Sequence, residues 1–110
     1  MEDLKVAIGS DHGGFEYKEK IIEYLKSRNI PYVDMGTHTK EACDYPEIAR
    51  AVAERVISGK SNRGILVCGT GIGMSIAANK VRGIRAALCG DTYSARVSRA
   101  HNNANILCLG

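Results

Sequence analysis

The stretch of sequence that decides the fold reads Ile65-Leu66-Val67-Cys68-Gly69-Thr70-Gly71-Ile72-Gly73-Met74-Ser75-Ile76. Its apolar start is typical of a buried strand, its alternate glycines predict a tight turn, and residues 74–80 have a helical pattern. The thiol of Cys68 is then expected where a strand ends, beside the N–H groups of a helix N-terminus. Such N–H groups bind anions, and such surroundings favour a cysteine thiolate that serves as base or nucleophile. The stretch therefore predicts a reactive sulfur next to a site for negative charge.

Hydrophobic runs and helical stripes alternate along the whole chain. This order predicts one α/β domain with three layers, in which helices cover both faces of a doubly wound, five-stranded parallel sheet. In such sheets ligands bind beyond the carboxyl ends of the strands. Strands are expected over 6–8, 32–36, 64–68, 84–88 and 105–109, and helices over 15–28, 45–57, 72–80 and 92–100.

Composition excludes several classes of partner. The net charge is +3, and the basic residues of the second half are spaced out with one tyrosine among them, unlike a nucleic-acid-binding surface. No apolar stretch approaches the ~20 residues of a membrane span, and the acidic N-terminus is unlike a signal peptide. The four cysteines form no Cys-x-x-Cys pair, so we expect no zinc site and free thiols in a reducing, cytoplasmic compartment. We expect Cys89 and Cys108 to be small core residues.

Polar residues follow most of the expected strands. If the sheet is parallel, we expect most of them to share one edge. For several of them a structural role competes with a functional one: Asp11 is a possible helix cap, Tyr45 a packing residue, and His101 a partner of a helix dipole. The groups are Ser10-Asp11-His12-Gly13-Gly14, Asp44-Tyr45, Cys68 with its glycine loop, Gly90-Asp91-Thr92 and His101-Asn102-Asn103.

Other interpretations of the glycine loop fail at particular positions. A dinucleotide fingerprint requires a third glycine where Met74 or, in the other register, Ile76 stands. A P-loop requires a Gly-Lys-Ser/Thr sequence that is absent. A cysteine phosphatase would carry an arginine at position 74 to bind phosphate. A metal site built from Asp11, His12, Cys68 and His101 lacks local ligand spacing, so we predict no metal.

The polar groups are part of longer motifs. These are Gly9-Ser10-Asp11-His12-Gly13-Gly14, Asp44-Tyr45-Pro46, the run from Cys68 to Lys80, Gly83-Ile84-Arg85-Ala86, and Ser98-Arg99-x-His101-Asn102. With them the chain resembles, over essentially its whole length, the ribose-5-phosphate isomerase B family, which also includes the galactose-6-phosphate isomerase subunits. The resemblance implies a Rossmann-like or flavodoxin-like sheet with strand order 2-1-3-4-5. It also implies a homodimer or tetramer with shared active sites.

The resemblance further implies interconversion of an aldose phosphate and a ketose phosphate through an enediolate, without metal or cofactor. Cys68 would move a proton between C1 and C2, residues 69–73 would form the anion hole, and His101 would open the sugar ring. Asp11 and Asn102 would hold sugar hydroxyls, and His12 would approach the phosphate. The expected catalytic residues are Cys68, His101 and Thr70, and the expected substrate-binding residues are Asp11, His12, Tyr45, Gly69, Gly71, Ile72, Gly73, Ser75 and Asn102.

Three other functions compete with a ribose 5-phosphate isomerase. Within the family, the substrate could be galactose 6-phosphate or allose 6-phosphate. Outside it, a cysteine at a strand end followed by a glycine-threonine loop also suits a phosphoryl carrier of sugar transport, or a sugar-phosphate-binding module without catalysis. Family members usually continue past the last strand with a helix and phosphate-binding arginines, whereas residues 1–110 predict a single sugar-phosphate isomerase domain without that helix.

Overall fold

The computed structural model describes residues 3–41 and 43–110. Strands and helices alternate as expected, and one short 3-10 helix, η1, precedes α1. The elements are β1 (Val6–Ser10), η1 (His12–Gly14), α1 (Phe15–Ser27), β2 (Tyr32–Asp34), α2 (Tyr45–Ile57), β3 (Arg63–Val67), α3 (Ile72–Asn79), β4 (Ala86–Leu88), α4 (Thr92–Ala100) and β5 (Ile106–Leu109).

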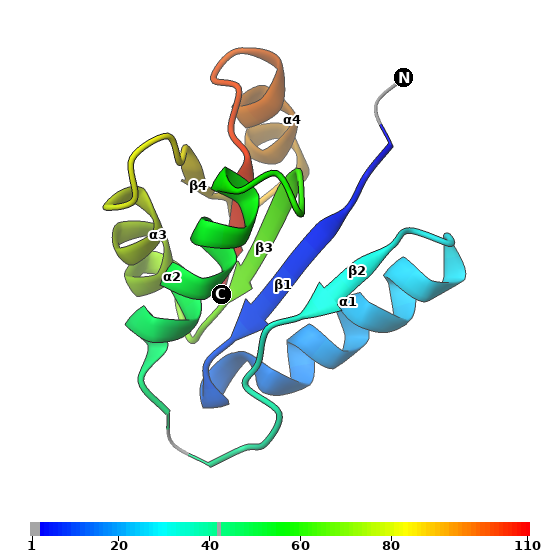
Figure 1. Ribbon diagram of the computed structural model, residues 1–110, viewed down its shortest axis with the longest axis vertical. Helices are drawn as coiled ribbons and strands as arrows, with labels where there is room; N and C mark the ends of the chain where they lie inside the picture. Colours follow the sequence, from blue (N-terminus) through cyan, green and yellow to red (C-terminus); the bar gives the residue numbers. More distant parts are fainter. Residues whose placement is uncertain (1–2, 42) are drawn as a thin grey trace.

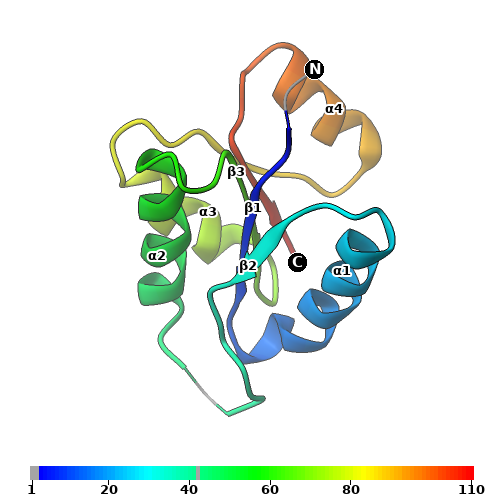
Figure 2. The same ribbon diagram turned by 45° about the vertical axis from the view of Figure 1, so that its right-hand side comes forward.

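The elements form three layers around a five-stranded, all-parallel sheet. Figure 2 shows α2 and α3 on one face of the sheet and α1 and α4 on the other. The α2 and α3 face carries the larger core, in which Ala49, Val52 and Ala53 of α2 meet Leu66 and Met74. The α1 face buries Val6 and Ile8 of β1 against Ile22 and Leu25. The predicted doubly wound α/β architecture is therefore confirmed.

The strand order is β2-β1-β3-β5-β4, so the expected order 2-1-3-4-5 is wrong at its last two positions. β5 pairs with β3 from Gly64 opposite Ile106 to Val67 opposite Leu109, and β4 pairs with the other side of β5. The longer β5 has two fully buried side chains, whereas β4 has three residues and an exposed Leu88. The more apolar strand, β5, therefore occupies the buried position between β3 and β4.

The side chain of Asn79 covers the free edge of β4. Its amide nitrogen donates to the carbonyl of Ala86, and its amide oxygen accepts from the N–H of Ala86, at 3.0 and 2.8 Å. Asn79 therefore satisfies backbone groups that another strand would otherwise pair with. Asn79 thus has a structural role at the edge of the sheet.

Asp91 and Asp44 occupy the N-cap positions of α4 and α2. Asp91 accepts from the N–H of Ser94 at 2.7 Å at the start of α4, and this hydrogen bond lowers the pKa of the Asp91 carboxyl. Asp44 occupies the N-cap position of α2, but its side chain makes no capping hydrogen bond, and Pro46 lies in the first turn.

No helix within the described ranges is long and apolar enough to cross a membrane.

Candidate active site

The turn after β1 and the loop after β3 meet at the carboxyl edge of the sheet. The N–H of Asp11 donates to the carbonyl of Val67 at 3.2 Å. A Cβ placed on Gly13 would lie 3.7 Å from the nitrogen of Gly69, and one on Gly14 would lie 2.6 Å from the oxygen of Val67. By its sequence alone, this glycine pair would suit close approach of a ligand to the backbone. The structure shows instead that Gly14 is required for close packing of η1 on β3.

The side chain of Cys68 lies below the glycine loop. It is 7% exposed and belongs to the larger core, yet its Sγ accepts a hydrogen bond from the N–H of Gly71 at 3.1 Å. The backbone of Gly71 has a φ of 78°, a left-handed conformation that aims this N–H back at the sulfur. Such a bond strengthens when the acceptor carries negative charge. The loop therefore holds the sulfur in place against a backbone donor.

The start of α3 supplies the expected N–H groups. The first N–H groups of a helix have no acceptor within the helix. Thr70 Oγ1 accepts the N–H of Ile72 at 3.2 Å, and the N–H groups of Gly73 and Met74 lie in the same first turn. Ser75 donates its hydroxyl proton to the carbonyl of Ile72 at 2.9 Å, so this side chain is already engaged within the helix. Of the N–H groups expected beside Cys68, that of Gly71 contacts the sulfur, and that of Ile72 is bonded to Thr70.

The other buried cysteines are core residues, as predicted. Cys108 of β5 is fully buried. Burial, with smaller contributions from the neighbouring Cys68 and Cys89 thiols, raises the pKa of Cys108 to about 12. Cys108 therefore stays a neutral thiol at physiological pH. All four cysteines are free.

Tyr45 forms one wall beside the glycine loop. A Cβ on Gly73 would lie 2.8 Å from the Tyr45 ring, so the ring packs directly on the first turn of α3. The side chain remains 39% exposed, so part of it is open to solvent. Packing and binding are therefore compatible roles for Tyr45.

Asp11 and His12 lie at this edge as well. One carboxylate oxygen of Asp11 accepts from the N–H of Gly14 at 2.9 Å, so Asp11 does cap η1. The residue is only partly buried, and its second oxygen has capacity for a ligand hydroxyl. His12 is exposed. The structure thus brings Asp11, His12, Tyr45, Cys68 and the glycine loop to one edge.

His101 and Asn102 lie at the opposite edge of the sheet. His101 caps the carboxyl end of α4, and the carbonyl of Asn102 accepts from Arg85 Nε at 2.6 Å. Both precede β5, whereas Cys68 follows β3, which runs parallel to β5 (Figure 1). A strand of five residues spans about 17 Å. His101 and Asn102 are therefore exceptions, within a single chain, to the expectation that most of the polar groups share one edge.

Sequence analysis missed a buried ion pair next to the site. Lys18 of α1 donates to both carboxylate oxygens of Asp34 at the end of β2, at 2.8 and 2.7 Å. Lys18 shares a helical stripe with Ile22 and Leu25, so a lysine within an apolar stripe was the available signal. Within residues 3–41 and 43–110, no group of three or more His, Cys, Asp or Glu side chains could hold a metal.

Comparison with known proteins places the chain in a family. The family described as Ribose/Galactose Isomerase matches residues 6–110. Ribose-5-phosphate isomerase B of Escherichia coli is 49% identical over 106 residues, which are 96% of this chain and 71% of that protein.

Solved structures agree with this match. Ribose-5-phosphate isomerase B of Clostridium thermocellum superposes with a TM-score of 0.96 at 57% identity, covering 97% of this chain and 72% of that one. The Mycoplasma genitalium enzyme with bound ribulose-5-phosphate gives a TM-score of 0.92 at 42% identity and covers 100% and 74%. The fold, the thiol loop and these matches together show that the chain belongs to the ribose/galactose isomerase family.

Proposed function

We propose that this protein interconverts ribose 5-phosphate and ribulose 5-phosphate through an enediolate. The observation that carries the proposal is the hydrogen bond from the Gly71 N–H to the Cys68 sulfur at the start of α3. A base and a set of anion-stabilising donors are what removal of a proton next to a carbonyl requires. The relatives with this activity give the substrate class.

Cys68 is the base in this proposal. Its thiolate removes the proton from C2 of the open-chain aldose, the C2 electron pair forms the C1–C2 double bond, and the negative charge moves to the C1 oxygen. The proton of the C2 hydroxyl then passes to the C1 oxygen, the thiol returns its proton to C1, and the C2 oxygen becomes the ketose carbonyl. A positioned base typically contributes ~10²–10⁴-fold to the rate of such a step.

The glycine loop stabilises the enediolate oxygen. Thr70 Oγ1 accepts from Ile72, so its own hydroxyl proton is free to donate to substrate. The N–H groups of Gly69 and Gly73 line the rest of the hole, and one preorganised donor of this kind is worth ~10²–10³-fold. The N–H groups of Gly71 and Ile72 are bonded to Cys68 Sγ and Thr70 Oγ1 and hold the loop around the hole. Asp11 and Tyr45 hold the sugar, with Ser75 beside them, and His12 approaches the phosphate.

A second copy of the chain completes the site in this proposal. His101 opens the sugar ring and Asn102 holds a hydroxyl, but both lie at the edge opposite Cys68 in their own chain. The exposed side chains of Ile72, Ile76 and Leu88 near the thiol loop suit contact with another protein surface. We therefore propose a homodimer in which each site combines Cys68 of one copy with His101 of the other.

Mixing two inactive variants tests the shared site. Cys68→Ala and His101→Ala are each expected to be inactive alone. Refolded together, they should recover about a quarter of wild-type activity, because half of the dimers pair both variants and each such dimer contains one intact site. No recovery from a mixture shown to form mixed dimers would contradict the shared site.

A substrate panel tests the reaction itself. Ribose 5-phosphate, allose 6-phosphate and galactose 6-phosphate are compared with wild type and Cys68→Ala. The proposal expects the highest kcat/KM for ribose 5-phosphate, no turnover by the variant, and no effect of chelators. Preference for a hexose phosphate would assign the protein another substrate of the same family, and turnover by Cys68→Ala would show that Cys68 is not the base.

The four free thiols also suit a reducing compartment such as the cytoplasm, where we place the protein.

A further inference from the structure

We propose that the buried Lys18–Asp34 pair is a positioning device for the substrate site, which holds the Asp11–His12 turn in its binding geometry. The inference rests on the proposed function. It adds residues that touch no substrate and that lie on the outer side of β1, away from the thiol loop.

The pair is closely packed and charged. The Lys18 side chain is 0% exposed, and its Nζ contacts both oxygens of Asp34 and, at 3.4 Å, Oε1 of Glu19. Its Nζ also lies 5.2 Å from the centre of the Phe15 ring. Burying an ammonium group is unfavourable unless it is paired in one particular geometry. α1 and the end of β2 are therefore tied together in that geometry.

A chain of hydrogen bonds leads from Asp34 to the site. Asp34 Oδ1 accepts from the N–H of Gly36 at 3.0 Å. The carbonyl of Gly36 accepts from the N–H of Ser10 at 2.7 Å, and the N–H of Thr37 donates to the carbonyl of Ser10 at 2.8 Å. Ser10 immediately precedes Asp11. The Asp34 carboxylate, which binds Lys18, therefore holds residues 36 and 37, and these residues hydrogen-bond to Ser10, the last residue of β1.

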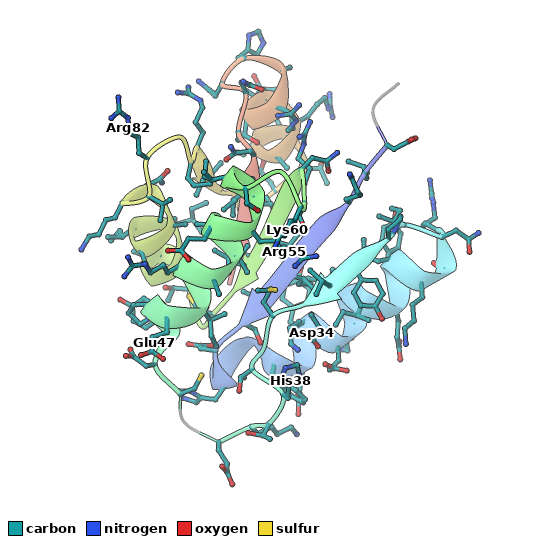
Figure 3. The ribbon with its side chains drawn as sticks, viewed as in Figure 1. Asp34, His38, Glu47, Arg55, Lys60 and Arg82 are labelled. Atoms are coloured by element: carbon teal, nitrogen blue, oxygen red, sulfur yellow. The ribbon has the colours of Figure 1, made fainter. Side chains whose placement is uncertain are left out.

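Ser10 is held in place by these main-chain hydrogen bonds. Its hydroxyl is fully buried and has no hydrogen-bond partner within the described part of the chain. The side chain therefore gives no anchorage, and the main-chain bonds to residues 36 and 37 hold this end of β1 on the β2 side. Figure 3 shows Asp34 at the end of β2 and His38 on the connection that follows it. His38 Nδ1 lies 3.8 Å from Asp34 Oδ2 but is itself largely exposed.

The same connection carries a second ion pair that serves as a matched control. Lys40 pairs with Glu16 of α1, and both side chains are exposed. This contact also joins the segment to α1, and it lowers the pKa of Glu16 through the Lys40 ammonium. Exposed pairs of this kind contribute little. If the buried pair alone positions the site, loss of Lys40 leaves substrate binding unchanged.

The experiment compares Lys18→Met with Lys40→Met in the full chain, with ribose 5-phosphate as substrate. Methionine keeps most of the buried stem and removes the charge. We expect KM to rise about tenfold in Lys18→Met while kcat changes less than about threefold, because displaced binding groups weaken binding more than the thiol chemistry. Lys40→Met should retain the wild-type KM. Asp34→Asn keeps an oxygen that can accept from the N–H of Gly36, so it should raise KM by a smaller factor than Lys18→Met does. This variant also tests the inference if Lys18→Met fails to fold.

The outcomes separate the inference from the proposed function. A purely structural pair would lower thermal stability and the active fraction, and so kcat, with KM unchanged; that result overturns the inference. An equal rise of KM in Lys40→Met would overturn it too. A wild-type protein without isomerase activity would instead overturn the proposed function. Hydrogen exchange at the Ser10 and Thr37 amides gives an independent readout, because it should accelerate in Lys18→Met and not in Lys40→Met, and unchanged exchange contradicts the positioning chain.

Discussion

Replacing Gly71 by alanine probes the thiol loop at its tightest point. Gly71 has a φ of 78°, and a Cβ there would lie 2.5 Å from Cδ1 of Leu88 and 3.0 Å from the carbonyl carbon of Leu109. The leucine tip can move because Leu88 is partly exposed, but the backbone of Leu109 is fixed in β5. The loop must therefore shift away from the end of β5.

The expected cost combines two effects. A left-handed conformation costs a residue with a Cβ about 1–2 kcal/mol, and overpacking a filled site costs typically about 1–3 kcal/mol. We expect a total of about 2–5 kcal/mol, which for a domain of this size lowers Tm by about 10–20 °C. The displaced N–H also leaves the Cys68 sulfur, so kcat should fall at least about tenfold.

Gly69→Ala is the matched control for stability. No atom lies within 4 Å of a Cβ at Gly69, and its φ is not in the left-handed region. Its Tm should stay within about 2 °C of wild type, because a surface substitution without strain typically changes stability by less than about 0.5 kcal/mol. Thermal unfolding followed by circular dichroism measures both variants. A Gly71→Ala protein as stable as Gly69→Ala would refute the assigned loop geometry.

Two further predictions concern the sheet. The first concerns Cys108, whose thiol is protonated in both the folded and the unfolded chain below pH 9. As the pH rises from 9 toward 12, only the unfolded chain releases this proton, so the folded state loses stability. In urea titrations the free energy of unfolding should fall by up to about 1.4 kcal/mol per pH unit above pH 9, and less steeply in Cys108→Ala. Identical slopes for the two proteins would count against the buried neutral thiol. Asn79→Ala removes both hydrogen bonds to Ala86 and should cost about 1–2 kcal/mol in the same assay; an unchanged midpoint would show that water replaces them fully.

Local signals in the sequence were enough for the elements and the thiol loop. Strand and helix periodicity placed the alternating elements within a few residues, and the glycine spacing after Val67 predicted the turn that brings N–H groups to Cys68. Both signals depend on neighbours in sequence. They need no knowledge of how distant segments pair.

The features that depend on distant pairing were not predictable in the same way. Whether β4 or β5 pairs with β3 depends on how much apolar surface each buries there, and both arrangements allow parallel strands. The place of His101 follows from the path of α4 across the sheet. The role of Gly14 depends on contact with the oxygen of Val67, which no local pattern reveals.

The central claim is that Cys68 moves the proton in the reaction. Ribose 5-phosphate carrying deuterium at C2 reports this step directly, since NMR follows the rate at which that bond is broken. Wild type should cleave the C2–D bond, and Cys68→Ala should still bind the sugar phosphate while cleavage falls at least about 10²-fold. Cleavage by Cys68→Ala near the wild-type rate would contradict the account and assign the proton transfer to another group.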